Sequence, residues 1–245
     1  MSSLRVTGSS QRGQRRLGSA LRYVVAIIAI TFALFPVIWV ISASVNPSGS
    51  LASQELIPDN ASLANYRVLL GGDPRFPFLR WLWNSFYLAT ITSILAVFIT
   101  SLSAYAFSRW SFPGRAAGLL ILLSTQMIPA GMLLIPIFII VARLGLQDNL
   151  LGLSLAYITT AVPLSIWILR GYYDTIPFDL EEAAMVDGAT RLSAFWRIIL
   201  PLSTPALAVI FLFNFLNAWN EWQVANVILK ADDMRTWPLG LNDFI

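Results

Sequence analysis

Long apolar stretches alternate with short polar segments along most of this chain. Five stretches have about the 20 residues that a helix needs to cross a bilayer: residues 23–45, 83–107, 117–141, 150–169 and 203–229. The third contains Pro129 and Pro136, which membrane helices tolerate because neighbouring helices satisfy the freed backbone groups. The pattern predicts an all-α, polytopic membrane helical bundle with five spans, in which residues 23–229 form the transmembrane domain.

The charged residues between the apolar stretches indicate how the chain crosses the membrane. Residues 1–22 hold five arginines and no acidic residue, and Arg-rich flanks stay on the cytoplasmic side. We therefore expect a cytoplasmic N-terminus, outer loops at 46–81 and 143–149, an inner segment at 170–200 and an outer tail at 230–245. Ten basic residues then lie inside and six outside, which agrees with this orientation.

Composition supports a membrane protein and excludes several kinds of chemistry. Of the 245 residues, 57% are apolar and 12% are charged, whereas soluble domains average about 25% charged residues. Cysteine and histidine do not occur, so disulfides, thiolate nucleophiles, histidine–metal sites and histidine acid–base catalysis are excluded. The phosphate-binding loop GxxxxGK(S/T) is absent as well. We expect a protein that is not an enzyme, with no cofactor, no metal and no nucleic-acid partner.

The polar segment that follows the fourth apolar stretch is poorly explained by packing in lipid. From Glu181 it reads EEAAMVDGATRLSAFWRIILPLSTPAL. Acidic residues gather where a helix would begin, as the helix macrodipole favours, and Gly188 permits a bend. A pair of amphipathic helices lying on the membrane is the plain alternative, but their polar faces are typically basic. We interpret the segment as a surface that docks onto a basic partner protein.

The spacing within this segment matches a known signature. Glu182-Ala183-Ala184 is followed after three residues by Gly188, and after nine more by Ile198, Leu200 and Pro201. This pattern resembles the EAA motif of importer-type permeases of ABC transporters. Other pieces resemble the carbohydrate importer branch, with its maltose-type permease subunits, among them Asn84-Ser85-Phe86, Ala104-Tyr105-Ala106-Phe107, Met127-Ile128-Pro129 and Trp219-Asn220-Glu221.

The resemblance implies a permease subunit of an ATP-driven sugar importer in a bacterial or archaeal plasma or inner membrane. Its partners would be a dimer of ABC ATPase subunits, a second related permease and an extracytoplasmic sugar-binding protein. The segment around Glu182 would be the coupling helix, and its coupling residues would be Glu181, Glu182, Ala183, Ala184, Asp187 and Gly188. Such permeases usually have six spans, so a sixth span is expected to be missing after residue 245.

Polar residues also occur within the predicted spans, at Gln126 in the third and at Asn214, Asn217, Asn220 and Glu221 in the fifth. Asn217 and Glu221 are four residues apart and share a helix face, to which Asn214 adds. Two explanations remain open. These side chains make hydrogen bonds between helices, or they line a path for a hydroxyl-rich substrate.

Two other classes of protein are alternatives to an importer permease. A membrane enzyme or assembly factor would need catalytic residues at a membrane face, and the absence of histidine and cysteine argues against it. A secondary transporter or channel would use charged residues near mid-membrane or inverted repeats, neither of which is visible in this sequence. The outer loop 46–81 and the tail would either contact a binding protein or form solvated loops.

Overall fold

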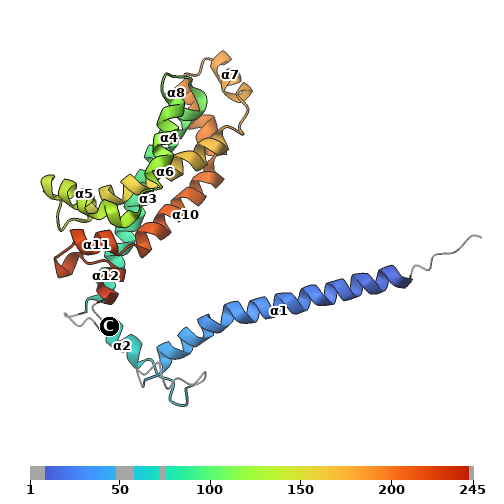
Figure 1. The fold of residues 1–245 in the computed structure, drawn as a ribbon, viewed down its shortest axis with the longest axis vertical. Coiled ribbons are helices and arrows are strands. Elements are labelled where there is room, and N and C mark those ends of the chain that lie inside the picture. Colours follow the sequence, from blue (N-terminus) through green and yellow to red (C-terminus); the bar gives the residue numbers. More distant parts are fainter. Residues whose placement is uncertain (1–8, 48–57, 72–75, 243–245) are drawn as a thin grey trace, which may run out of the picture. The chain divides into compact units, whose positions relative to one another are not determined.

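The computed structural model describes residues 9–47, 58–71 and 76–242, and these residues form helices and connecting turns without a strand (Figure 1). The predicted all-α class is confirmed. Parts of the predicted N-terminal segment, outer loop and tail, at residues 1–8, 48–57, 72–75 and 243–245, lie outside the described residues. The chain divides into two compact units, Met1–Asp73 and Pro74–Ile245, which are described separately.

The first unit contains one long apolar helix and one short helix. In α1, Ser9–Val45, the stretch Gly18–Val45 reaches a mean hydropathy of 2.8 and its most apolar window has no buried residue. Such a surface requires lipid or another protein to cover it. The short α2, Ala64–Leu70, was not predicted. It is held to the end of α1 by Asn65, whose Nδ2 donates to the backbone oxygens of Ser44 (3.1 Å) and Asn46 (3.0 Å).

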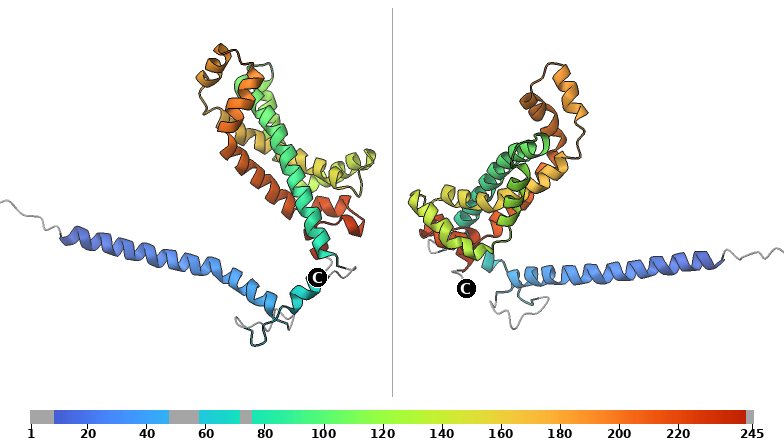
Figure 2. Two further views of the ribbon diagram at one scale, coloured as in Figure 1. Left: turned by 180° about the vertical axis from the view of Figure 1, so that it is seen from behind. Right: turned by 45° about the horizontal axis from the view of Figure 1, so that its top comes forward.

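Three helices form the body of the second unit. The central helix α3, Phe78–Arg109, packs against both α6, Leu150–Tyr173, and α10, Thr204–Asn220 (Figure 2). Side chains of α3 buried in these contacts are largely small, including Ser85, Ser93 and Ala96, and small residues let membrane helices approach closely. The apolar core has two clusters, one around Leu88 and Leu153 and the other around Tyr105 and Phe195.

The predicted third span is bent in the structure, and a second bend lies at the start of the predicted fifth span. The third divides into α4, Arg115–Thr125, and α5, Ala130–Arg143, with an angle of 103° between them. Pro129 lies at this break with ψ of 130°, and a proline cannot donate the hydrogen bond that a continuous helix needs. A second bend, of 74°, separates Arg191–Leu202 from α10. By length and composition, the described residues therefore contain three helices able to cross a membrane, or up to five if each bent pair is one span.

The predicted fifth span, 203–229, is shorter in the structure. Helix α10 ends at Asn220, and Glu221 has extended backbone angles before α11, Gln223–Ile228, begins. The Glu221 carboxylate accepts hydrogen bonds from the backbone N–H groups of Val224 (2.8 Å) and Ala225 (3.2 Å). An acidic side chain in this position satisfies the free N–H groups at a helix start, so this residue both ends one helix and begins the next.

Residues 232–242 are packed onto the unit and do not form a solvated loop. The 3₁₀ turn Asp232–Met234 (η2) and α12, Trp237–Asn242, lie at the Phe78 end of α3 (Figure 1). Asn84 Nδ2 donates to the backbone oxygens of Asp233 (3.0 Å) and Arg235 (2.9 Å), and the Trp237 N–H donates to Ser85 Oγ (2.7 Å). The start of α3 is thus tied to the chain end by backbone and side-chain hydrogen bonds.

A second tie holds the segment after α11 to the turn between α5 and α6. Asp148 Oδ1 accepts hydrogen bonds from the backbone N–H groups of Lys230 and Ala231. These backbone donors, with a smaller contribution from the Lys230 charge, hold the pKa of the Asp148 carboxyl below its ordinary value of 3.8. The ionised form of Asp148 is therefore the form that fixes this turn.

Candidate functional site

The segment that carries the EAA pattern forms α7, Asp179–Val186, at one end of the second unit (Figure 1). Its first turn contains Asp179, Glu181 and Glu182, where the macrodipole favours acidic side chains. At its end, the N–H of Gly188 donates to Met185 O (3.1 Å) and that of Ala189 donates to Ala184 O (2.9 Å). These are the two bonds of a Schellman motif. Gly188 has φ of +90°, so the predicted bend is confirmed.

The chain after Gly188 returns toward the membrane helices through a segment of mixed helical type. Thr190 Oγ1 accepts from the Ser193 N–H (3.2 Å) and caps α8, Arg191–Ala194. A π-helical segment follows, Phe195–Ile199 (η1), and then α9, Leu200–Leu202. Phe195 and Ile199 have no exposed surface. The return segment is therefore anchored in the core and holds α7 from its C-terminal side.

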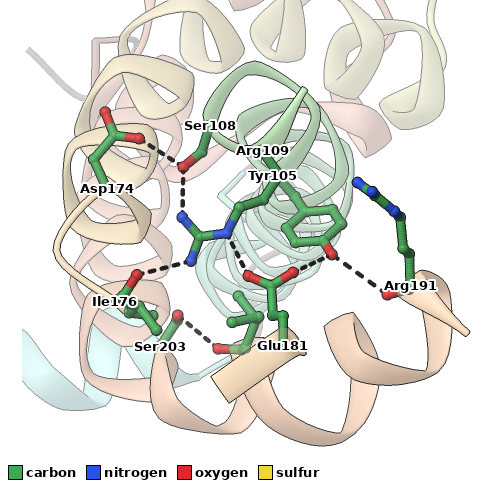
Figure 3. Close-up of polar contacts among 9 residues, drawn as sticks. Tyr105, Ser108, Arg109, Asp174, Ile176, Glu181, Arg191 and Ser203 are labelled. Atoms are coloured by element: carbon green, nitrogen blue, oxygen red, sulfur yellow. Dashed lines mark hydrogen bonds and ion pairs between the residues drawn. The ribbon is translucent and has the colours of Figure 1, made fainter. Parts of the chain in front are cut away.

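Glu181 faces into the protein and is engaged by two side chains of α3. Its residue exposure is 6%. The Tyr105 hydroxyl donates to Glu181 Oε2 (2.6 Å), and Arg109 Nε donates to Glu181 Oε1 (Figure 3). Burying a carboxylate is costly unless it is paired and hydrogen-bonded, and here both oxygens have partners. The inward face of α7 is thereby tied to the end of α3.

Arg109 uses all three of its guanidinium nitrogens. Besides the bond from Nε to Glu181, Nη1 donates to Ser108 Oγ (3.2 Å) and Nη2 donates to the backbone oxygen of Ile176 (3.0 Å) (Figure 3). The guanidinium carbon lies 4.3 Å from the ring centroid of Phe178, within range of a cation–π interaction. Ser108 Oγ in turn donates to Asp174 Oδ1 (2.6 Å). One arginine thus joins α3, the turn after α6 and α7.

The other predicted coupling residues lie on or near the surface. Glu182, Ala183, Asp187 and Gly188 are exposed, and Ala184 is half-buried. The Glu182 carboxylate has no hydrogen bond or ion pair within the described residues. Its neighbour Val186 is 87% exposed. The outward face of α7 therefore presents acidic groups beside an apolar side chain, as a surface for a protein partner does.

Sequence reasoning did not identify Tyr105 and Arg109 as part of this site. Tyr105 belonged only to the pieces of the family resemblance, and Arg109 was only one of the ten basic residues expected on the inside. The sequence nevertheless contained a signal for Arg109. This arginine lies two residues beyond the apolar stretch 83–107, which contains no charged residue. An ionisable residue at such a position usually has a specific partner.

The predicted substrate-path residues meet in one cavity of about 640 Å³. Side chains from α3, α6, α10 and the bend after α4 line it. All five predicted residues are among them, namely Gln126, Asn214, Asn217, Asn220 and Glu221, together with Thr92, Tyr157, Thr160, Ser165 and Phe213, which the sequence had not singled out. Asn214 and Asn217 lie on α10, whereas Glu221 lies just beyond its end, so the three residues meet at the cavity without sharing one helix.

The polar residues of the cavity differ in how freely they could meet a ligand. Asn214 is 4% exposed and bonds Ser165 on α6 (3.3 Å), which is an interhelical hydrogen bond. The Asn220 amide donates to its own helix at Leu216 O (2.7 Å). Asn217 is exposed and has no hydrogen bond to any described residue. Asn217 is therefore the one amide of this cavity that makes no hydrogen bond among the described residues.

Glu221 is occupied at the edge of the cavity. Its carboxylate receives the Tyr157 hydroxyl (2.6 Å) in addition to the two N–H groups of α11. The single ionisable carboxylate of the cavity is thus held by protein groups, and the remaining lining is neutral. The described residues contain no group of three acidic side chains placed to bind a metal ion.

Comparison with known proteins places this architecture in a family. Residues 99–241 match the family described as binding-protein-dependent transport system inner membrane component. The maltose/maltodextrin transport system permease protein MalG of Salmonella typhimurium is 36% identical over 251 residues, covering 96% of this chain and 84% of MalG. The galactooligosaccharides transport system permease protein GanQ of Bacillus subtilis is 33% identical, covering 91% of this chain and 79% of GanQ.

A solved structure agrees with these sequence relationships. It is the crystal structure of a bacterial ABC transporter involved in the import of the acidic polysaccharide alginate. One of its chains matches with a TM-score of 0.73 and 29% identity, covering 98% of this chain and 81% of that chain. The fold is that of an ABC transporter permease.

The packed helices and the exposed acidic helix define a multi-pass membrane component of a transport system rather than an enzyme. The chain belongs to the family of inner membrane components of binding-protein-dependent transport systems. The resemblance inferred from the EAA pattern is confirmed.

Proposed function

We propose that the chain is the permease subunit of an ATP-driven sugar importer and that α7 is its coupling helix. The observation that carries this proposal is the outward face of α7, where Glu182 has no partner among the described residues and Val186 is exposed, on a helix whose inner face is bonded to Arg109. An acidic helix presented in this way suits a basic cleft, because opposite charges favour docking in one register. The partner would be a dimer of ABC ATPase subunits that hydrolyses ATP.

The orientation of the chain follows from its charges. The Arg-rich residues 1–22 keep the N-terminus in the cytoplasm. With α7 also on the cytoplasmic side, the α11–α12 region lies at the opposite, external side of the second unit (Figure 1). That region is where an extracytoplasmic sugar-binding protein would dock. A second, related permease would complete the translocation path with this chain.

The chemistry of the cavity supports a neutral, hydroxyl-rich cargo. Asn217 offers free amide groups, Tyr157 and Phe213 add aromatic surface, and the single carboxylate of Glu221 is already occupied. Sugar sites combine a few oriented polar groups with largely apolar walls, as ligand pockets do in general. MalG and GanQ belong by name to systems for maltose or maltodextrin and for galactooligosaccharides. A sugar is accordingly the proposed substrate class.

The experiment that tests this proposal is purification of the tagged chain from its own host in mild detergent, with co-purifying proteins identified by mass. We expect an ABC ATPase subunit and a second permease, and the genes of that system should include a sugar-binding protein. A chain that remains without partners at several detergent strengths would contradict the proposal. Uptake of radiolabelled sugars by the reconstituted complex then identifies the cargo.

A further inference from the structure

Arg109 and Glu181 connect the proposed coupling helix to the longest helix of the second unit. We infer that these two residues, with Tyr105, are positioning residues that make α7 and the end of α3 move as one body. The inference rests on the proposed docking of α7 to an ATPase, and it concerns how motion reaches the membrane helices. It assigns Glu181 and Glu182 to separate tasks, one holding α7 and the other meeting the partner.

The hydrogen bonds of Arg109 fix the position of α7 more closely than an attraction between two charges would. Its three nitrogens reach Glu181, Ser108 and the backbone oxygen of Ile176, which come from three different segments. A planar guanidinium can satisfy acceptors in three fixed directions at once, whereas a lysine ammonium acts as a point charge on a flexible stem. The direction of each bond therefore specifies where α7 lies relative to α3.

Burial separates this pair from an ordinary surface ion pair. The side chains of Arg109 and Glu181 are 2% and 8% exposed. Exposed pairs contribute little because water and salt screen them, and the Arg80–Asp233 pair, with side chains 53% and 51% exposed, is of that kind. A buried pair that loses one member leaves an uncompensated charge. The pair accordingly favours one seated position of α7 over displaced ones.

The two adjacent glutamates point to different surroundings, because successive residues of a helix are about 100° apart. Glu181 meets Tyr105 and Arg109, whereas Glu182 meets solvent. A force applied by a partner at Glu182 therefore acts on a helix whose opposite face is bonded to α3. The contact with Phe178, at the start of α7, adds a second attachment to the same arginine.

Helix α3 is suited to carry such a displacement. Its 32 residues include no glycine and no proline, so it forms a continuous rod of about 48 Å. The neighbouring α4–α5 segment is instead bent by 103° and α6 contains Pro163. Midway along α3, Thr92 lines the cavity, and at its far end Asn84 and Ser85 hold the C-terminal region. A shift of α7 would then alter a wall of the cavity.

The test uses three variants and a distance measurement. Because the chain has no cysteine, Leu180→Cys on α7 and Ser111→Cys beyond α3 provide two spin-label sites on this chain, both exposed and both away from the outward face that carries Glu182. Arg109→Lys and Glu181→Gln are the positioning variants, and Glu182→Gln is the matched neighbour. Each is prepared as the full complex with its ATPase, and sugar uptake, ATP hydrolysis and the label–label distance distribution are measured.

We expect Arg109→Lys and Glu181→Gln to retain the ATPase while the distance distribution broadens and sugar uptake per ATP falls roughly fivefold or more. Glu182→Gln should keep the narrow distribution and weaken ATPase binding. A solely structural role would lower the unfolding temperature without broadening the distribution at working temperature, and that result would overturn the inference. Unchanged uptake and distances in both positioning variants would also overturn it.

The failure of the proposed function would look different. In that case the unmodified chain would bind no ATPase or would take up no sugar in its complex. If Arg109→Lys does not fold, Glu181→Gln decides, because glutamine keeps the size of the side chain and its capacity to accept the Tyr105 hydrogen bond. The exchange Arg109→Glu with Glu181→Arg supplies a rescue test, in which partial recovery of uptake relative to the single exchanges is expected.

Discussion

Glu181 and Glu182 are adjacent in the chain yet occupy opposite environments. Glu181 is 6% exposed and bonded to Tyr105 and Arg109, whereas Glu182 is exposed and has no partner among the described residues. The inward residue fixes the helix, and the outward residue is available to another protein. Substitutions at these two positions should consequently fail in different ways.

Reversal of the exposed charge should disrupt coupling without disrupting the fold. We expect Glu182→Lys to insert and to keep the unfolding temperature of the unmodified chain, because this exposed side chain bonds to none of the residues that the structure describes. Its complex should lose the ATPase on purification and should take up no sugar, since like charges at a docking surface repel. Co-purification and uptake measure both effects. Normal uptake by Glu182→Lys would contradict the coupling role.

Removal of the buried cation should destabilise the chain. Arg109→Ala leaves the Glu181 carboxylate buried without its charge partner, which costs about 3–5 kcal/mol. The matched control is Arg80→Ala, which breaks an exposed pair and should cost about 1 kcal/mol or less. Thermal unfolding of the detergent-purified variants measures the two. Equal losses of stability in the two variants would show that burial does not make the Arg109–Glu181 pair more stabilising than an exposed pair.

Substitution of Gly188 tests whether the bend after α7 is required for assembly. At its φ of +90° a side chain is strained, and no atom lies within 4 Å of an added Cβ, so any loss comes from the backbone and not from a clash. Gly188→Val should cost at least about 1–2 kcal/mol and impair ATPase assembly. Gly171→Ala, a helical position with equally open space, is the control and should not destabilise the chain, because alanine has the higher helix propensity. Wild-type assembly and uptake by Gly188→Val would argue against a required bend.

Asp148 predicts a dependence of stability on pH. Its pKa is lowered in the folded chain, so its contribution is present above the ordinary pKa of 3.8 and is lost as pH falls through the lower folded value. Asp148→Asn should therefore be less stable than the unmodified chain at pH 7, and the difference should shrink from about pH 4 downward. Unfolding temperatures of both proteins across this range provide the check. A difference independent of pH would refute the assignment.

Asn217 tests the cavity as a sugar path. Asn217→Leu removes the one cavity amide that lacks a partner among the described residues, and leucine is well accepted in a membrane helix. We expect unchanged assembly, because no internal hydrogen bond is lost, and a higher KM for sugar uptake. The KM is measured from transport kinetics in reconstituted vesicles. The same KM in both proteins would leave Asn217 without a role in the path.

The sequence predicted the long helices because continuous apolar runs of this length have few other stable structures in a membrane. It did not predict the 103° bend at Pro129, since prolines are tolerated both in straight and in broken membrane helices. The short helices α2, α11 and α12 were missed for another reason. They are stabilised by contacts with α1, α3 and α5, which a local pattern does not contain.

The candidate site was predicted only where it depends on local spacing in the sequence, and not where it depends on tertiary contacts. The spacing of Asn214, Asn217 and Glu221 placed them on one helix face, and they do line one cavity. The inward orientation of Glu181 was not predicted, because its partners Arg109 and Tyr105 lie 72 and 76 residues away in the chain. Charge clustering at a helix start indicates which residues are acidic, but only tertiary packing decides which of them is buried.

The most direct test of the central claim is a cross-link from the outward face of α7. Val186→Cys is the sole cysteine of the variant chain and 87% exposed at the native residue, so it carries a short photo-activated label in native membranes. The account predicts one main adduct, with the mass of this chain plus an ABC ATPase subunit, and a yield that changes when ATP is added. A labelled chain that gives no ATPase adduct would contradict it.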